Sequence, residues 1–138
     1  MTTTTTAFAR EPDLSVAEFR RVLVESGLGA TRPVDDEARL RKMLTGAGLV
    51  MTARNPDGSL VGVARCLSDG AWVAYLAELA VSRSVQGQSV GKLLLRAVRD
   101  ELGPRVTLVL ASVPEAVGFY EKVGMPRMAD VFCYRREG

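Results

Sequence analysis

The stretch that decides the fold is AYLAELAVSRSVQGQSVGKLLLRAVRD, at residues 74–100. It begins with an apolar run suited to a buried strand and ends with an amphipathic helix, in which Leu94, Ala97 and Val98 share one face. The turn between them carries Gly87 and Gly91, where a backbone without Cβ can approach a ligand closely. Because the first N–H groups of a helix have no partners, this unit predicts a site for a phosphate or pyrophosphate.

The spacing of this turn excludes two common phosphate loops. A P-loop requires Ser or Thr after Gly-Lys, but Gly91 and Lys92 are followed by Leu93. A dinucleotide-binding loop requires G-x-G-x-x-G near a first strand, and residues 87–91 do not fit that pattern. A different class of phosphate loop is therefore expected.

The turn resembles the acyl-CoA pyrophosphate loop of the GNAT superfamily of N-acyltransferases. The loop pattern, Arg/Gln-x-x-Gly-x-Gly/Ala, matches QGQSVG at residues 86–91, and the family helix A-x-x-F-Y-x-x-x-G-F is similar to PEAVGFYEKVGM at residues 114–125. The two elements stand in the family's order, with one strand between them. Ser89 departs from the pattern, because it stands where the family usually has a glycine. Its N–H can still donate to a phosphate, while its Cβ narrows the loop.

The resemblance implies acetyl-CoA as cosubstrate, with its pantetheine arm between the fourth and fifth strands. An amine then attacks the thioester directly, without a covalent enzyme intermediate and without a metal. The residues implied in donor binding come from the fourth strand, the loop, the end of the fifth strand and the last helix. They are Leu79, Ala80, Val81, Gln86, Gly87, Gln88, Ser89, Val90, Gly91, Lys92, Ser112 and Phe119.

Turns and periodicity across the chain predict one domain, residues 1–138, of the α/β class. Helices are expected at 15–26, 35–46, 89–102 and 114–123, and strands at 5–10, 49–54, 60–67, 72–81, 106–111 and 131–135. Short turns at 55–58 and 68–70 permit antiparallel pairing, whereas the all-apolar run 106–111 is typical of a buried parallel strand. A mixed sheet with helices on both faces follows, and this is also the architecture of the GNAT fold.

Two residues are the catalytic candidates. Tyr120 matches the family tyrosine that protonates, or donates a hydrogen bond to, the departing CoA sulfur. Glu78 lies in an otherwise apolar strand, on the face of Leu76 and Ala80 if side chains alternate. An acid on this strand is the general base in several family members. A salt bridge is an equally good explanation, because a buried carboxylate needs a partner.

Three functions remain open on the sequence. The first is acetyl transfer to a primary amine of a small molecule, with residues 27–33 as a candidate wall of the acceptor pocket. The second is transfer to a protein or peptide, and the third is a non-catalytic acyl-CoA-binding module that regulates a partner. An exposed patch around Trp72 and Tyr75 would favour a homodimer.

Composition narrows the remaining classes. The chain has 138 residues, a net charge of +2 and no histidine, which excludes Ser-His-Asp and Cys-His catalysis and zinc sites built with His. Cys66 and Cys133 lack C-x-x-C spacing and are expected to be buried or half-buried thiols in strands, without a catalytic or redox role. The balanced charge, the lack of a long apolar run and the absence of a signal-peptide pattern lead us to expect a cytoplasmic location, with no nucleic-acid or membrane partner.

Overall fold

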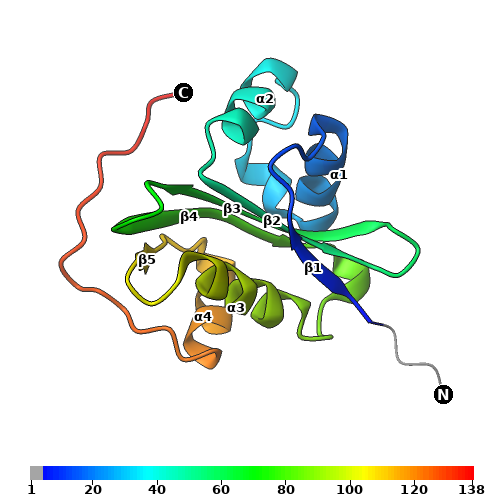
Figure 1. Ribbon diagram of the computed structural model, residues 1–138. Coiled ribbons are helices and arrows are strands. Elements are labelled where there is room, and N and C mark those ends of the chain that lie inside the picture. Colours follow the sequence, from blue (N-terminus) through cyan, green and yellow to red (C-terminus); the bar gives the residue numbers. More distant parts are fainter. Residues whose placement is uncertain (1–4) are drawn as a thin grey trace.

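The computed structural model describes residues 5–138. The low-complexity stretch Thr2–Thr6 is expected from its sequence to be frayed at its start, and that start lies outside the described residues. The sheet has the strand order β1-β2-β3-β4-β5, with β1–β4 antiparallel and β5 parallel to β4 (Figure 1). The strands are β1 (Ala7–Arg10), β2 (Leu49–Arg54), β3 (Leu60–Ser68), β4 (Val73–Val81) and β5 (Thr107–Val109). The predicted mixed sheet is confirmed.

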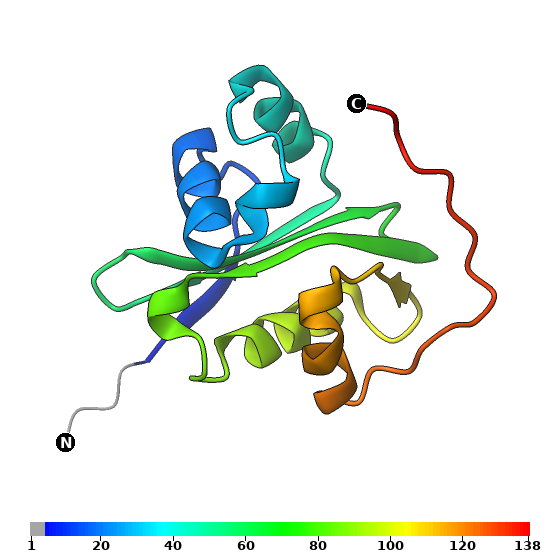
Figure 2. The ribbon, with the colours of Figure 1, turned by 180° about the vertical axis from the view of Figure 1, so that it is seen from behind.

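Helices cover both faces of the sheet (Figures 1 and 2). On one face lie α1 (Val16–Ser26), the 3₁₀ turn η1 (Leu28–Thr31) and α2 (Glu37–Thr45); on the other lie α3 (Val90–Leu102), after the turn η2 (Arg83–Val85), and α4 (Val117–Lys122), after the turn η3 (Pro114–Ala116). Ser15 and Glu18 have the spacing of a capping box, and one of its two bonds is present, because the Ser15 hydroxyl accepts from the Glu18 N–H at 3.2 Å. None of the helices in residues 5–138 is long and apolar enough to cross a membrane.

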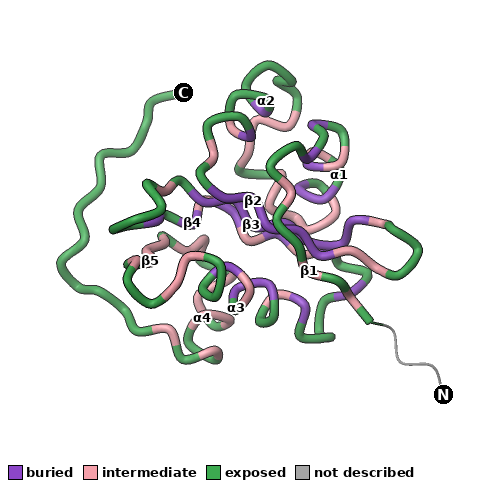
Figure 3. Tube along the Cα trace, in the orientation of Figure 1, coloured by how far each residue is buried: buried purple, intermediate pink, exposed green. Residues whose placement is uncertain are grey.

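Each face of the sheet has its own apolar core (Figure 3). Phe19 and Leu23 of α1 and Leu40 of α2 are fully buried against Val63 on one side. On the other side, a second cluster joins α3 to β2, β3 and β4; it includes Leu94, Val98, Met51, Cys66 and Leu76. The amphipathic patterns read from the sequence therefore bury the faces that they predict.

A bulge in β4 reverses the side-chain alternation near Glu78. Arg65 is paired with Glu78, but its neighbour Cys66 is paired with Leu76, so Ala77 is an extra residue in β4. Leu76 consequently joins the α3 cluster, whereas Glu78 faces the α1/α2 side. The expectation that Glu78 shares a face with both Leu76 and Ala80 is wrong for Leu76, because simple alternation takes no account of a bulge.

β4 and β5 separate soon after they meet. They pair at three positions only, Val73 with Thr107, Ala74 with Leu108 and Tyr75 with Val109. Within the described residues no strand pairs with this side of β4 beyond Tyr75, so β5 is shorter than the predicted 106–111. The two strands form a fork, with the free edge of residues 77–81 on one arm.

The end of the chain corrects three expectations. Cys133 is exposed and lies in no described strand, whereas Cys66 is buried in β3 as expected. The predicted strand at 131–135 is not formed; the segment runs outside the sheet and is exposed, with Phe132 at 92% exposure (Figure 3). A strand needs a neighbour to share its backbone hydrogen bonds, and no described segment lies beside this one. The predicted helix at 114–123 begins as the 3₁₀ turn η3, closed by the Ala116 N–H bond to the Val113 carbonyl, and becomes α-helical at Val117.

Candidate active site

The predicted phosphate loop joins the end of β4 to α3. The Gln86 side chain donates to the Val81 carbonyl at 3.0 Å, which holds the loop against the end of the strand. Gly87 and Ser89 both have left-handed backbones, with φ of 87° and 65°. Ser89 is the N-cap of α3, but its hydroxyl makes no capping bond. Gln86 therefore positions the loop, and the Ser89 hydroxyl is free to meet a ligand.

The N–H groups at the start of α3 are available to an anion. Among residues 5–138, no acceptor is found for the N–H groups of Ser89, Val90, Gly91 and Lys92. These are the unpaired donors that open any α-helix, and the helix dipole adds positive potential at the same point. The left-handed residues Gly87 and Ser89 curve the backbone just before them. This concave set of donors is suited to a pyrophosphate.

Ser89→Gly is expected to stabilise the protein. Ser89 is the one residue other than glycine in 5–138 with a positive φ, and a left-handed backbone costs a Cβ-bearing residue about 1–2 kcal/mol. Part of this gain is lost to the greater entropy of unfolded glycine, so the free energy of unfolding should rise by up to about 1 kcal/mol in urea denaturation. Ser89→Ala is the control, since it keeps the Cβ and should bring no gain. An equal rise in the free energy of unfolding of both variants would contradict the proposal that the backbone at Ser89 is strained.

Phe119 supports the loop from α4. A Cβ built on Gly91 would lie 3.3 Å from the Phe119 ring and 3.6 Å from Val81, so the first turn of α3 lies tight against both residues. Phe119 also stacks edge-to-face with Tyr120, with ring centroids 5.0 Å apart. The structure thus brings together the end of β4, the loop and the Phe119-Tyr120 helix, three parts that the sequence predicts to be neighbours.

Tyr120 lines a cavity at the open end of β5. This cavity, of about 350 Å³, lies between the chain after β5 and α4, and Leu110, Ala111 and Ser112 also line it. Desolvation by burial raises the pKa of the Tyr120 phenol to about 12, so the hydroxyl stays protonated well above neutral pH. The Ser112 hydroxyl donates to the carbonyl of Val113 at 2.8 Å, which leaves its lone pairs as acceptors.

Glu78 is held by two arginines that the sequence reasoning missed. Arg65 Nε donates to one carboxylate oxygen, while Arg65 Nη2 at 3.1 Å and Arg32 Nε at 2.8 Å donate to the other. Arg32 Nη2 also donates to the carbonyl of the bulge residue, Ala77, at 2.7 Å. Arg32 and Arg65 are therefore the partners that the salt-bridge interpretation of Glu78 requires. Arg65 could have been found, because it is the single charged residue inside the apolar run of β3.

The three fourth-strand candidates lie on the free edge of the fork. Leu79 packs against the α3 cluster, and Ala80 is buried on the α1/α2 side. Val81 packs beside Val85 and Val90 at the base of the loop. The backbone of these three residues pairs with β3 on one side, and no described strand pairs with it on the other.

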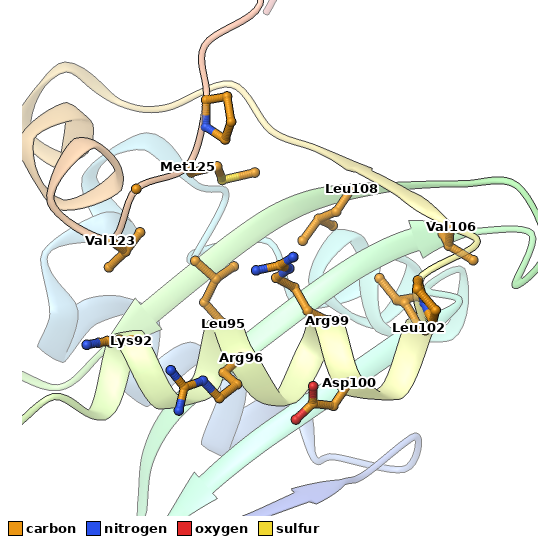
Figure 4. A pocket seen from close by; sticks show the side chains of 14 residues that line it. Lys92, Leu95, Arg96, Arg99, Asp100, Leu102, Val106, Leu108, Val123 and Met125 are labelled. Atoms are coloured by element: carbon orange, nitrogen blue, oxygen red, sulfur yellow. The ribbon is translucent and has the colours of Figure 1, made fainter.

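A second cavity lies farther along α3. It has a volume of about 720 Å³, and of the predicted site residues only Lys92 lines it (Figure 4). Figure 4 shows Arg99 pointing into this cavity, towards Leu108 and Met125. Residues 5–138 contain no group of three or more His, Cys, Asp or Glu side chains that could hold a metal ion.

Comparisons with known proteins agree with this geometry. Residues 25–135 match the family model of the acetyltransferase (GNAT) domain. A Deinococcus radiodurans R1 protein assigned as an acetyltransferase is 28% identical, with a TM-score of 0.72 over 94% of this chain and 88% of that one. No curated protein sequence has significant similarity to this chain.

Two further solved structures share the fold at lower identity. A protein of meticillin-resistant Staphylococcus aureus, named as a probable acetyltransferase, is 21% identical, with a TM-score of 0.77 over 97% of this chain and all of the other. The aminoglycoside N-acetyltransferase AAC(6')-Iy, in complex with CoA, is 19% identical, with a TM-score of 0.71 over 99% and 98%. The family match covers most of the chain, and the chain therefore belongs to the GNAT family of acetyl-CoA-dependent acetyltransferases.

Proposed function

We propose that this chain transfers an acetyl group from acetyl-CoA to the primary amine of a small molecule, by direct attack within a ternary complex. The observation that carries the proposal is the fork between β4 and β5, which leads directly to unpaired N–H groups at the start of α3. An extended pantetheine arm fits such an edge, and a pyrophosphate fits such a helix start.

The reaction follows from that placement. The pantetheine amides pair with the backbone at Leu79, Ala80 and Val81, and the pyrophosphate accepts from the loop. This sets the thioester near Ala111, Ser112 and Tyr120. The unprotonated amine attacks the thioester carbonyl; a C–N bond forms, the C–S bond breaks, and the CoA thiolate departs. Holding both reactants in line is itself a large part of the rate enhancement.

Tyr120 is proposed to act on the departing sulfur by a hydrogen bond. Its pKa of about 12 exceeds the ordinary thiol pKa of about 8.5, so full proton transfer to the thiolate is unfavourable. A hydrogen bond to the developing negative charge needs no such transfer, and Tyr120 lines the same cavity as Ala111 and Ser112. Tyr120 is therefore a donor that keeps its proton.

Glu78 is proposed to act through Arg32 rather than as a free base. Both of its oxygens accept from guanidinium groups, and its side chain is only 2% exposed. A direct base role would require Arg32 to leave, whereas the amine proton can pass to water at the open face of the fork. The carboxylate then serves to hold Arg32 and the bulge in place.

Tyr120→Phe is expected to lower kcat by about tenfold or more, because a hydrogen bond to a developing charge is worth about 1.5–3 kcal/mol. The affinity for acetyl-CoA should stay within about twofold, since the ring and its packing on Phe119 remain. Steady-state kinetics and calorimetric titration measure the two quantities. A parallel fall in both would show that the tyrosine only shapes the site.

The function itself is tested by calorimetric titration with acetyl-CoA, followed by thiol-release assays on a panel of amines. Binding with release supports the proposal. Binding without release on any amine would favour the protein acceptor or the regulatory module, and absence of binding would overturn the donor site.

The homodimer expected from the sequence is supported by the exposed side chains of Leu67, Trp72, Val73 and Tyr75 at the β3–β4 hairpin.

A further inference from the structure

The acceptor has one open route to the thioester. The phosphate loop, α3 and Tyr120 lie on one side of β4, so the donor occupies that side of the fork. The acceptor must then approach from the side of α1, η1 and α2. At that side, Arg32 reaches from the segment after η1 to the carbonyl of Ala77, two residues beyond the last β4–β5 pair. Arg32 therefore stands at the vertex of the fork, on the acceptor's side.

The charge at this point is positive. One carboxylate, Glu78, is shared by two guanidinium groups, so the cluster carries an excess positive charge. Solvent reaches Arg32 most readily, because its side chain is 21% exposed, against 9% for Arg65 and 2% for Glu78. The carboxylates within α1 and α2 each have another partner, whereas Asp35 and Asp36, exposed just before α2, form no ion pair among the described residues. Glu18 pairs with Arg54, Glu25 with Arg21 and Glu37 with Arg41.

Two nitrogens of the Arg32 guanidinium are held by buried partners, whereas the third makes only exposed hydrogen bonds that a ligand can replace. Nε donates to Glu78 at 2.8 Å and Nη2 to the Ala77 carbonyl at 2.7 Å, which sets the plane of the guanidinium. Among the described residues, Nη1 donates only to the neighbouring Thr31, to its carbonyl at 3.2 Å and to its hydroxyl at 3.0 Å, and both bonds are exposed. A carboxylate is a stronger acceptor than either group, so it can replace them without disturbing the inner bonds.

We infer that Arg32 determines acceptor specificity, and that the accepted amine carries a carboxylate close to its reacting nitrogen, as an α-amino acid does. The inference rests on the proposed function, because it names the acceptor class of that site. Polycationic amines are disfavoured at this point, since they bring like charge to Arg32 and Arg65. The chain's acceptor class thus differs from the aminoglycosides for which one of its structural neighbours is named.

Matched acceptors test the inference directly. The full chain is assayed for thiol release from acetyl-CoA with several α-amino acids, with the corresponding α-amides, and with spermidine as the polycation. Each amino acid should exceed its amide in kcat/KM by about tenfold or more, the range of a charge-assisted hydrogen bond. Protonation alone would favour the amides, because their amino group is less basic and more of it is unprotonated at neutral pH. A preference for the amino acids would therefore have to come from the enzyme.

Substitution of Arg32 tests whether this residue causes the preference for α-amino acids over their amides. Arg32→Gln leaves the Arg65–Glu78 pair in place, so it removes the excess positive charge of the cluster without leaving Glu78 unpaired. It should reduce kcat/KM for amino acids by about tenfold while changing the amides less than about threefold. Arg41→Gln on α2 is the control, because it removes an exposed arginine from another pair and should retain the preference.

The possible outcomes distinguish a failure of this inference from a failure of the proposed transferase function. Release with amides or spermidine at rates equal to or above those of amino acids would overturn the inference and leave the transferase standing. A preference that survives Arg32→Gln would overturn the assignment to Arg32. No release on any amine, with acetyl-CoA bound, would overturn the proposed function and the acceptor class with it.

Discussion

Gly91→Glu is expected to abolish CoA binding. A side chain at this position must enter the narrow space beside Phe119 and Val81, where even a Cβ lies 3.3 Å from the ring. The new carboxylate also stands at the start of α3, where the unpaired N–H groups are proposed to receive the pyrophosphate. Several charge-assisted hydrogen bonds of about 1.5–3 kcal/mol each are then lost, so the affinity should fall at least about a hundredfold in calorimetric titration.

Gly91→Ala separates size from charge in this test. The family pattern admits alanine at this position, and the Phe119 ring can move by the few tenths of an ångström that a Cβ requires. Its CoA affinity should stay within about threefold of the unaltered protein. Circular dichroism confirms that both variants are folded. A folded Gly91→Glu protein with unchanged affinity would show that the pyrophosphate binds elsewhere.

Among the variants described, Glu78→Gln is expected to lower the free energy of unfolding the most. The substitution keeps the shape of the side chain but removes the single negative charge between Arg32 and Arg65. Breaking a buried ion pair from one side typically costs about 3–5 kcal/mol, because the remaining charge is buried without compensation. That is a large share of the total stability of a domain of this size. Urea denaturation followed by circular dichroism measures the loss.

The exposed pair of Glu37 and Arg41 provides the matched control. Glu37→Gln changes the same groups where both side chains are more than half exposed, and an exposed pair contributes less than about 1 kcal/mol. Equal small losses in both variants would contradict the structural role of Glu78. At a temperature where Glu78→Gln is folded, a pH–rate profile that flattens would instead support Glu78 as the general base.

The parts of the fold that local sequence encodes were predictable. The strand, loop and helix of residues 74–100 are contiguous, and each carries its own signal in apolar runs, glycines and helical spacing. The capping box at Ser15 is likewise a pattern within four residues. For the same reason the amino-acid sequence alone is enough to name the candidate residues of the loop, Gln86–Gly91.

The rest depended on contacts between distant segments. Arg32 and Glu78 are 46 residues apart, and nothing in either neighbourhood indicates the other. The bulge at Ala77 is a mismatch between two strands, so neither strand shows it alone. The segment 131–135 has a strand-like composition, but composition does not supply the neighbour that a strand requires.

The exposed β3–β4 hairpin has a consequence for optical work on this protein. It carries Trp72, the only tryptophan of the chain, with 75% of its surface exposed. An indole that is already in water emits at nearly the same wavelength before and after unfolding, so tryptophan fluorescence is a poor reporter of stability here. The same emission becomes informative when something covers the hairpin. A blue shift that grows with protein concentration would report a second copy at Trp72, independently of any change in the core.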